Sequence, residues 1–230
     1  MADIVCELRV CTNISTESFL YKTGQLTPND IRLTQVVDGL KEFFKYNSRY
    51  IESGQMDVYI SDNTIAEDMS LNEKILDVLH PKCQVITCLN NNYGCFNKGA
   101  GELEQWQYCQ NKHKILNKYK WFIHFEPRQF LLNNQFIDKF MEFHQNMFTS
   151  QKFNTENDLL DNVNTGLFVL ETRYMLQYIN SISPYYLVAN NISIEYVMYR
   201  FLRDNNIKFH CQKYMNVLWY DWLIRKTHNM

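Results

Sequence analysis

Three stretches within the first 61 residues decide the fold: Ile4-Val-Cys-Glu-Leu-Arg-Val-Cys11, Thr27-Pro-Asn-Asp30 and Met56-Asp-Val-Tyr-Ile-Ser61. The first and the third are rich in β-branched and apolar residues, a composition typical of strands. The middle stretch has the order of a helix start, with Thr27 as the N-cap, proline in the first helical position and an acid in the first turn. Together they predict a strand, a helix and a second strand in succession.

The same alternation continues as far as Pro127. A capping box at Ser70-Leu-Asn-Glu73 predicts a short helix that ends before Pro81. The further elements predicted in this part are a strand at Cys83–Leu89, a helix over 99–118 and a strand at Tyr119–Phe125. Four strand–helix repeats predict an α/β fold with a mainly parallel central sheet and helices on both faces, a single Rossmann-like domain.

The pattern beyond residue 133 is less regular. The predicted elements are helices at 136–148, 172–182 and 193–204 and strands at 166–170 and 207–211. An aromatic segment ends the chain, and Trp219 and Trp222 are spaced to share one helix face. Aromatic side chains stack on sugars, but they also pack a terminal helix onto a domain.

The charge balance excludes one broad class of function. The 230 residues include 23 Lys plus Arg and 25 Asp plus Glu, for a net charge of −2. A protein that holds nucleic acid by its phosphates should be basic, so no nucleic-acid partner is expected. Seven cysteines without a C-x-x-C pair, no signal peptide and no apolar stretch of about 18 residues predict a cytoplasmic protein with reduced thiols and no transmembrane segment.

Polar residues follow each of the first four predicted strands. They are Thr12, Asp62-Asn63, Asn90–Asn92 and Glu126, with Arg128 two positions further on. In an open parallel sheet ligands bind at the carboxyl ends of the strands. Any single polar loop is unremarkable, but four together favour a polar ligand.

A glycine-bearing turn, Gly94-Cys-Phe-Asn-Lys-Gly-Ala-Gly101, leads into the helix that starts near residue 99. Such a turn can offer backbone N–H groups to a phosphate, and Lys98 would add charge. It lacks the residue order of a P-loop and of the dinucleotide fingerprint. A flexible turn before a helix is the alternative.

His124-Phe-Glu126 matches half of a zinc deaminase signature, but the later P-C-x-x-C that this chemistry needs is missing. Glu126 is instead a candidate oxygen ligand for Mg²⁺ or Mn²⁺. The alternative is a glutamate in an exposed loop.

Three of these motifs resemble those of glycosyltransferases with the A-type fold, especially the family that includes many polysaccharide synthases. Asp62-Asn63-Thr64 is similar to their nucleotide-base loop, and residues 92–102 are similar to their third conserved turn. Tyr119–Pro127 resembles the strand that delivers their metal motif, usually two aspartates flanking one residue. Here Glu126 is the only acid of that motif.

The second half of the chain carries three more similarities. Asn164-Thr-Gly-Leu-Phe168 resembles the glycine turn on the acceptor side. Glu195, at a helix start, resembles the general base of inverting members, and His210 resembles the histidine that completes the metal shell. Small glycosyltransferases encoded by large DNA viruses have a similar length and similarly loosened motifs, which would place the protein in the host cytoplasm.

The resemblance implies one domain over 1–230, with a nucleotide-sugar half at 1–130 and an acceptor half at 131–230. It implies a nucleotide-sugar donor such as a UDP-sugar, a Mn²⁺ or Mg²⁺ cofactor, and a glycan or glycoprotein hydroxyl as acceptor. The candidate site residues are Thr12, Asp62, Asn63, Lys98, Glu126 and Arg128 for the donor, Glu195 for catalysis, Thr165, Gly166 and Trp219 for the acceptor, and Glu126 with His210 for the metal.

Two other functions stay open at this point. A nucleotidyltransferase on a related scaffold would have a glycine-rich loop after the first strand, and Thr12–Glu17 has no glycine. A non-catalytic module with the same fold would explain the incomplete metal motif.

Overall fold

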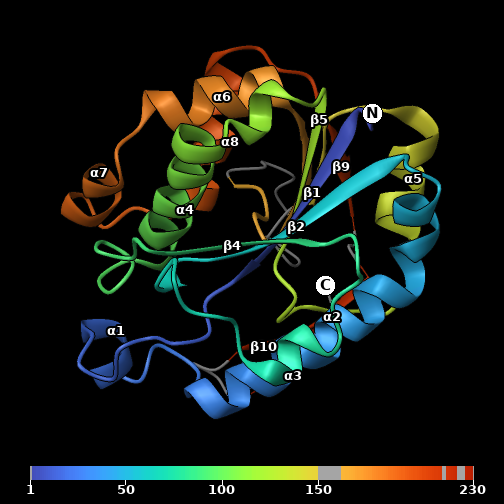
Figure 1. Ribbon diagram of the computed structural model, residues 1–230. Helices are drawn as coiled ribbons and strands as arrows, with labels where there is room; N and C mark the ends of the chain where they lie inside the picture. The colour runs from blue at the N-terminus through green and yellow to red at the C-terminus, as the bar shows by residue number, and fades with distance from the viewer. Residues whose placement is uncertain (1, 150–161, 214–215, 222–225, 230) are drawn as a thin grey trace.

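The computed structural model describes residues 2–149, 162–213, 216–221 and 226–229 (Figure 1). An eight-stranded sheet forms its centre. Its strands are β1 (Ile4–Val10), β2 (Met56–Asp62), β3 (Thr64–Ile65), β4 (Gln84–Leu89), β5 (Trp121–Phe125), β7 (Met147–Thr149), β8 (Leu167–Glu171) and β9 (His210–Gln212). They lie in the order β3-β4-β2-β1-β5-β8-β7-β9. Because β4, β2, β1 and β5 are parallel, the prediction of a mainly parallel sheet is confirmed.

Helices cover both faces of this sheet, as predicted (Figure 1). The helices are α1 (Phe19–Lys22), α2 (Asn29–Glu52), α3 (Glu73–Leu76), α4 (Lys98–His113), the 3₁₀ turn η1 (Ile115–Asn117), α5 (Gln135–Phe143), α6 (Thr172–Ser181), α7 (Pro184–Ala189) and α8 (Ile194–Asp204). One core packs α2 and α5 against the sheet, and the other packs α4, α6, α7 and α8 against its opposite face. Side chains of a strand alternate between faces, so Leu8 belongs to the α2 side while Glu7 and Arg9 point to the α4 side.

Several helix boundaries differ from the predicted ones. The N-cap of α2 is Pro28, one residue later than predicted. Helix α3 starts at Glu73 because the Asn72 side chain accepts a hydrogen bond from the Lys74 N–H at 3.0 Å, so Ser70 is not the cap. Helix α4 ends at His113 because Lys114 is left-handed, with φ 53°. The predicted helix at 136–148 likewise ends at residue 143, and β7 follows it.

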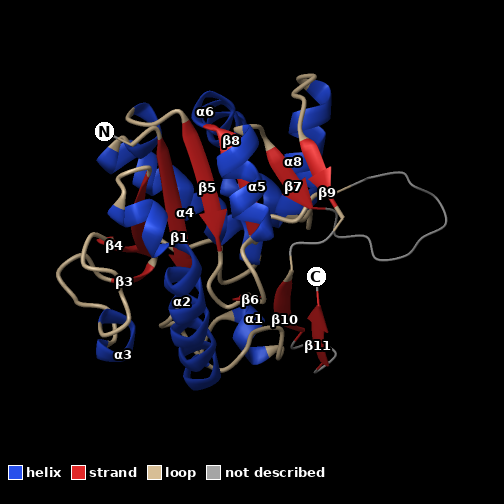
Figure 2. Cartoon of the chain, turned by 90° about the vertical axis from the view of Figure 1, so that its right-hand side faces the viewer, coloured by secondary structure: helices blue, strands red, loops and turns tan. Residues whose placement is uncertain are grey.

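The C-terminal segment is a β-structure. A three-stranded antiparallel sheet contains β6 (Phe130–Leu131), β10 (Val217–Asp221) and β11 (Lys226–Asn229) in the order β11-β10-β6. Figure 2 shows it below the ends of β1 and β5. The predicted terminal helix is therefore wrong: Trp219 lies in β10, opposite His228, and Trp222 lies outside the described residues. Backbone pairing with β6 and β11 overrides the helical spacing of the two tryptophans.

Within the residues that the structure describes, no helix is long and apolar enough to cross a membrane.

Candidate active site

The strand order reverses between β1 and β5. From β1 the chain proceeds to β2 and β4 on one side, and then β5 pairs with the other side of β1. Ligands of parallel α/β sheets bind beyond the carboxyl ends of the strands at such a reversal. Thr12, Asp62, Glu126 and Arg128 follow or end these strands, so the structure brings these sequence candidates to one edge of the sheet.

Asp62 joins the loops after β1 and β2. Its Oδ2 accepts hydrogen bonds from the Thr12 N–H at 3.0 Å and from the Thr12 hydroxyl at 2.6 Å. Its Oδ1 accepts from the N–H of Thr64 at 2.8 Å and from the Thr64 hydroxyl at 2.5 Å. The side chain is buried, and burial raises the pKa of Asp62. Both carboxylate oxygens are therefore engaged by the protein itself, and Asp62 fixes the position of Thr12.

Asn63 ties the same edge to the start of α4. Its amide donates to the carbonyl oxygens of Asn90 at 3.0 Å and of Gly101 at 2.8 Å, and the Cys11 thiol lies 3.5 Å from its Oδ1. Like Asp62, it is buried. Its polar atoms hold the loops of three strands in place below the site.

The glycine-bearing turn is closed by a residue that the sequence analysis did not select. The Glu104 carboxylate accepts hydrogen bonds from the N–H groups of Asn92 at 3.1 Å, Tyr93 at 2.9 Å and Gly94 at 3.3 Å. A Cβ on Gly94 would lie 2.8 Å from the Gly101 Cα, so the turn packs directly onto α4. These N–H groups are already satisfied, and the expectation that this part of the turn binds phosphate is not supported.

The start of α4 contacts the start of α8. Asn97 caps α4 by accepting the Ala100 N–H at 3.1 Å, and its amide donates to the Ile192 carbonyl at 3.1 Å. A Cβ on Gly99 would lie 2.6 Å from the Ile194 Cβ, so only glycine allows this approach. Lys98 is the first residue of α4 and is exposed.

This contact between α4 and α8 fixes the position of Glu195. It is in the first turn of α8, which Ser193 caps, and its side chain is half-buried. Its charge helps to raise the pKa of the buried Glu102, after burial itself and the opposing effect of Arg9. The structure therefore places Glu195 near Glu102, on the α4 side of the strand reversal.

Four charged side chains at the reversal form what we name the edge cluster: Arg9, Arg32, Glu126 and Arg128. Arg9 Nη1 lies 2.6 Å from Glu126 Oε1, and Arg128 Nη2 lies 3.3 Å from Glu126 Oε2. Burial alone would raise the pKa of Glu126, but Arg128 and Arg9, with smaller effects of His124 and Arg32, lower it to about 2. Glu126 is thus ionised at neutral pH, and its two oxygens face different guanidinium groups.

Arg32 is the unusual member of the edge cluster. It lies in the first turn of α2, where it is only 3% exposed. Its Nε is buried without a hydrogen-bond partner, and Arg32 makes no ion pair with any residue in the described ranges. Burial and the neighbouring Arg128 lower the pKa of Arg32 to about 9, so it is still cationic at neutral pH. A buried cation without a counter-ion is costly to a folded protein.

Deeper under the same strands lies a second polar group, the core cluster: Glu7, Ser61, Trp106 and His124. Glu7 Oε1 accepts the Ser61 hydroxyl at 2.7 Å, and its Oε2 accepts the Trp106 indole N–H at 2.7 Å and lies 2.9 Å from His124 Nδ1. Burial would raise the pKa of Glu7, but His124 and Ser61 lower it. His124 Nε2 lies 3.7 Å from Glu102 Oε1, so this carboxyl connects the two clusters.

The turn at residues 164–168 lies next to Glu126. The Glu126 N–H donates to the Gly166 carbonyl at 2.8 Å, and the Gly166 N–H donates to Asn164 Oδ1 at 2.7 Å. A Cβ at Gly166 would lie 1.6 Å from Gln129 Nε2, so the Gln129 amide packs directly against this glycine. Thr165 is buried beside it. The structure therefore brings Thr165 and Gly166 to the same edge as the edge cluster.

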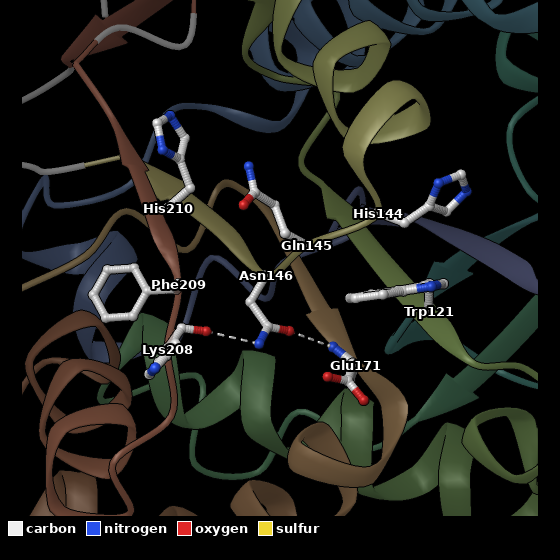
Figure 3. A pocket seen from close by; sticks show the side chains of 8 residues that line it. All are labelled: Trp121, His144, Gln145, Asn146, Glu171, Lys208, Phe209 and His210. Atoms are coloured by element: carbon white, nitrogen blue, oxygen red, sulfur yellow. Dashed lines mark hydrogen bonds between the residues drawn. The ribbon is translucent and has the colours of Figure 1, made fainter.

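His210 lies elsewhere. It is the first residue of β9, and its Nε2 is 3.0 Å from Lys139 Nζ on α5. Figure 3 shows it in a pocket with Trp121, the first residue of β5, whereas Glu126 follows the last residue of that strand. In this pocket of about 380 Å³ Asn146 bridges the Lys208 carbonyl and the Glu171 N–H, both at 2.9 Å. His210 and Glu126 are not brought together.

The residues at the strand reversal do not fit a divalent cation. Within the described ranges no group of three His, Cys, Asp or Glu side chains could hold a metal. Glu126 already faces Arg9 and Arg128, and both oxygens of Asp62 accept protein donors. Mg²⁺ and Mn²⁺ take oxygen ligands, and Mg²⁺ is usually held by one or two carboxylates together with substrate phosphates and waters. The edge cluster instead contains three guanidinium groups and one carboxylate.

The comparisons with known proteins identify the fold. No family model matches the chain, and no curated protein matches it. A solved protein of Desulfovibrio desulfuricans G20, described as a nucleotide-diphospho-sugar transferase, superposes with a TM-score of 0.56 over 93% of this chain and 80% of its own, at 11% identity. Core-mannan synthase A of Aspergillus fumigatus, in a Mn/GDP form, gives 0.53 over 95% and 74%, at 12% identity. The chain has the A-type glycosyltransferase fold. At these identities the likeness concerns the fold alone.

Sequence reasoning did not select several charged residues of the two clusters at this candidate site: Glu7, Arg9, Arg32 and Glu102. Glu7 and Arg9 alternate within an otherwise apolar strand, which is the signal of charged residues on a buried face. Arg32 precedes Val36 by four residues and Leu40 by eight, so helical spacing places it on the buried face of α2. Both signals are present in the sequence.

Proposed function

We propose that this protein transfers a sugar from a nucleotide-sugar donor to a hydroxyl acceptor. One observation carries the proposal: the charge of Glu195, a half-buried carboxylate, acts on the buried Glu102, and Glu102 in turn acts on Arg9 of the edge cluster in an A-type glycosyltransferase fold. Sugar transfer needs positive charge at the leaving diphosphate and a base at the acceptor hydroxyl. This edge of the sheet supplies both kinds of group.

The proposed reaction is a direct displacement. The acceptor oxygen forms a bond to the anomeric carbon while the bond from that carbon to the β-phosphate oxygen breaks. The electron pair of the broken bond leaves with the nucleoside diphosphate, and the acceptor proton passes to the Glu195 carboxylate. Such a displacement inverts the anomeric configuration.

The remaining candidates have supporting roles in this proposal. Residues 1–130 form the donor half, in which Asp62 and Asn63 hold the loop that carries Thr12, and Lys98 stands at the exposed start of α4. Residues 131–230 form the acceptor half, in which Thr165, Gly166 and Trp219 would border the acceptor, a glycan or glycoprotein. A UDP-sugar is the first donor to test, and GDP-sugars are the second because one solved neighbour is a GDP form.

The test is a turnover assay with Glu195→Gln. A panel of UDP- and GDP-sugars is incubated with the protein, and the released nucleoside diphosphate is measured with and without glycan acceptors. Because loss of a general base slows proton transfer by about 10²–10⁴-fold, Glu195→Gln should lose transfer by that factor and keep its affinity for the nucleoside diphosphate.

Glu73→Gln is the matched control, since Glu73 is an exposed glutamate in the first turn of another helix. This variant should retain full turnover. Undiminished transfer by Glu195→Gln would remove Glu195 from the base role. If the unaltered protein releases no diphosphate from any donor, it is a non-catalytic module of this fold.

A further inference from the structure

The edge cluster contains more positive than negative charge. Arg9, Arg32 and Arg128 lie around one carboxylate, Glu126. Two further carboxyl groups act on Arg9: Glu102, whose pKa is raised well above the usual range because it is buried, and Glu7, whose oxygens accept hydrogen bonds from Ser61 and Trp106 in the core cluster. A folded protein rarely leaves such an excess without an anion to balance it.

The arrangement of the cluster indicates where an anion would bind. Arg9 Nη1 and Arg128 Nη2 already hold opposite oxygens of Glu126, so Glu126 fixes these two guanidinium groups. Arg32 remains without an ion pair among the described residues, and its Nε has no hydrogen-bond partner. Arg128 is 22% exposed at its side chain, which opens the cluster to solvent on one side.

The backbone adds to this positive potential. Arg32 is the fourth residue of α2, a helix of 24 residues, so it stands in the first turn, where the helix dipole favours anions. A Cβ at Gly39 would lie 1.6 Å from the Pro127 carbonyl oxygen, so α2 touches the backbone between Glu126 and Arg128. This contact fixes the helix that carries Arg32 against the loop that carries Arg128.

From these observations we infer that Arg32 and Arg128 bind the diphosphate of the donor directly, over the Arg9–Glu126 pair, and that they replace a divalent cation in this protein. The inference rests on the proposed function, whose donor it describes more closely. Guanidinium groups match phosphate oxygens with two parallel hydrogen bonds. As the sugar leaves, the negative charge on the diphosphate increases, and the preformed guanidinium groups stabilise it.

The test measures binding of UDP, GDP and inorganic pyrophosphate by isothermal titration calorimetry, once in EDTA and once with Mn²⁺. We expect the preferred diphosphate to bind in EDTA within about twofold of its affinity in Mn²⁺, and the matching nucleoside to bind at least about tenfold more weakly. Loss of one charge-assisted contact should cost about 10- to 100-fold in affinity, so Arg32→Gln and Arg128→Gln should each weaken diphosphate binding by that factor.

Arg49→Gln is the matched control, because Arg49 is an exposed arginine at the other end of the same helix. It should bind the diphosphate as the unaltered protein does. Arg128 is partly exposed, so Arg128→Gln tests the inference even if a change at buried Arg32 impairs folding. The thermal melting of each variant in the absence of nucleotide identifies such a folding defect.

The outcomes separate this inference from the proposed function. Diphosphate binding that requires Mn²⁺ and disappears in EDTA would overturn the inference, and transfer of a sugar in the same samples would leave the function standing. Binding in EDTA that both arginine variants weaken supports the inference, even if no donor is turned over. Equal affinity of all three arginine variants would overturn it.

Discussion

The core cluster and the edge cluster lie one behind the other along the same strands. They differ in whether their buried charged groups have partners within the protein. In the core cluster each oxygen of Glu7 has a protein donor, because Ser61 and the Trp106 indole N–H point at it. In the edge cluster Arg32 has no ion pair among the described residues. Within the described ranges His124 Nε2 of the core cluster is buried without a hydrogen-bond partner, so the contrast concerns the charged groups: the Glu7 carboxylate has its donors in place, whereas the Arg32 guanidinium has no counter-ion. A buried charge with its partners makes a core specific and rigid, and one without them is a place where a ligand of opposite charge can bind.

The largest expected effect is on the core cluster. Glu7→Ala would leave the buried Ser61 hydroxyl without its acceptor and would remove the carboxylate from the Trp106 N–H and His124 Nδ1, which lie 3.3 Å from each other. Breaking a buried charged network by removing one partner costs about 3–5 kcal/mol. Urea unfolding should therefore show a loss of that size. Glu7→Gln keeps one oxygen acceptor and should lose less, and equal stability of both variants and the unaltered protein would contradict the satisfied network.

The second effect is a pH dependence at the edge cluster. Arg128 and Arg9 hold the pKa of Glu126 at about 2 in the folded state, against about 4.5 in an unfolded chain. The unfolded chain therefore binds the extra proton first, so the stabilisation is complete above about pH 5 and is lost as the pH falls toward 2. At about 1.4 kcal/mol per pKa unit, it amounts to about 3–4 kcal/mol.

Glu126→Gln tests this dependence, since an amide cannot titrate. The difference in unfolding free energy between this variant and the unaltered protein should be largest near neutral pH and should narrow as the pH falls from about 5 to 3. A difference that stays constant over this range would contradict the low pKa of Glu126. Glu73→Gln, which changes an exposed glutamate, should show no such pH dependence.

A smaller effect is expected where α2 touches the loop after β5. Gly39→Ala would press a Cβ against the Pro127 carbonyl, and overpacking of this kind costs about 1–3 kcal/mol. The displaced contact would also separate Arg32 from Arg128, so diphosphate affinity should fall together with the unfolding free energy. Lys41→Ala, at an exposed position of the same helix, should change neither quantity by more than about 0.5 kcal/mol.

The smallest expected effect is an unchanged or increased free energy of unfolding, whereas the changes above lower it. Replacement of a buried charge by an apolar side chain of similar length is often neutral or stabilising. Arg32→Met should therefore keep or raise the unfolding free energy of the ligand-free protein, by about 1–2 kcal/mol, although it loses diphosphate binding. Arg49→Met should do neither. A marked loss of stability in Arg32→Met would show that Arg32 has a structural partner.

The sequence alone predicts the parallel half of the sheet well, because β1, β2, β4 and β5 are separated by strong helix signals and share one edge. It also places Asp62 and Glu126 at that edge. It does not show that Asp62 binds its own chain or that Glu126 faces arginines, since Arg9 and Arg32 come from other elements. Such partners are set by packing of distant segments.

Each incorrect or incomplete prediction has an identifiable structural cause. Trp219 and Trp222 suit a helix by spacing, but Val217 pairs with Leu131 of β6, 86 residues earlier, and residues 218–221 pair with β11. The helix predicted at 136–148 ends early because His144 adopts φ 48°, a left-handed conformation that the sequence pattern does not predict. His210 is on a predicted strand, yet β9 joins the far side of the sheet beside β7.

The hydrogen bond from the Glu126 N–H to the Gly166 carbonyl has a consequence for how this protein could diversify. The chain leaves the edge of the sheet after residue 126 and returns to the same point at residue 166, where β8 lies against β5. The segment 127–165 therefore begins and ends at two positions that this hydrogen bond joins. Arg128 stands at the start of this segment, and α5 and β7 lie within it, so insertions or deletions confined to its loops beyond Arg128 would leave the carboxylate between Arg9 and Arg128 in place. Under the proposed function, acceptor preference could therefore evolve in those loops while the donor site keeps its geometry.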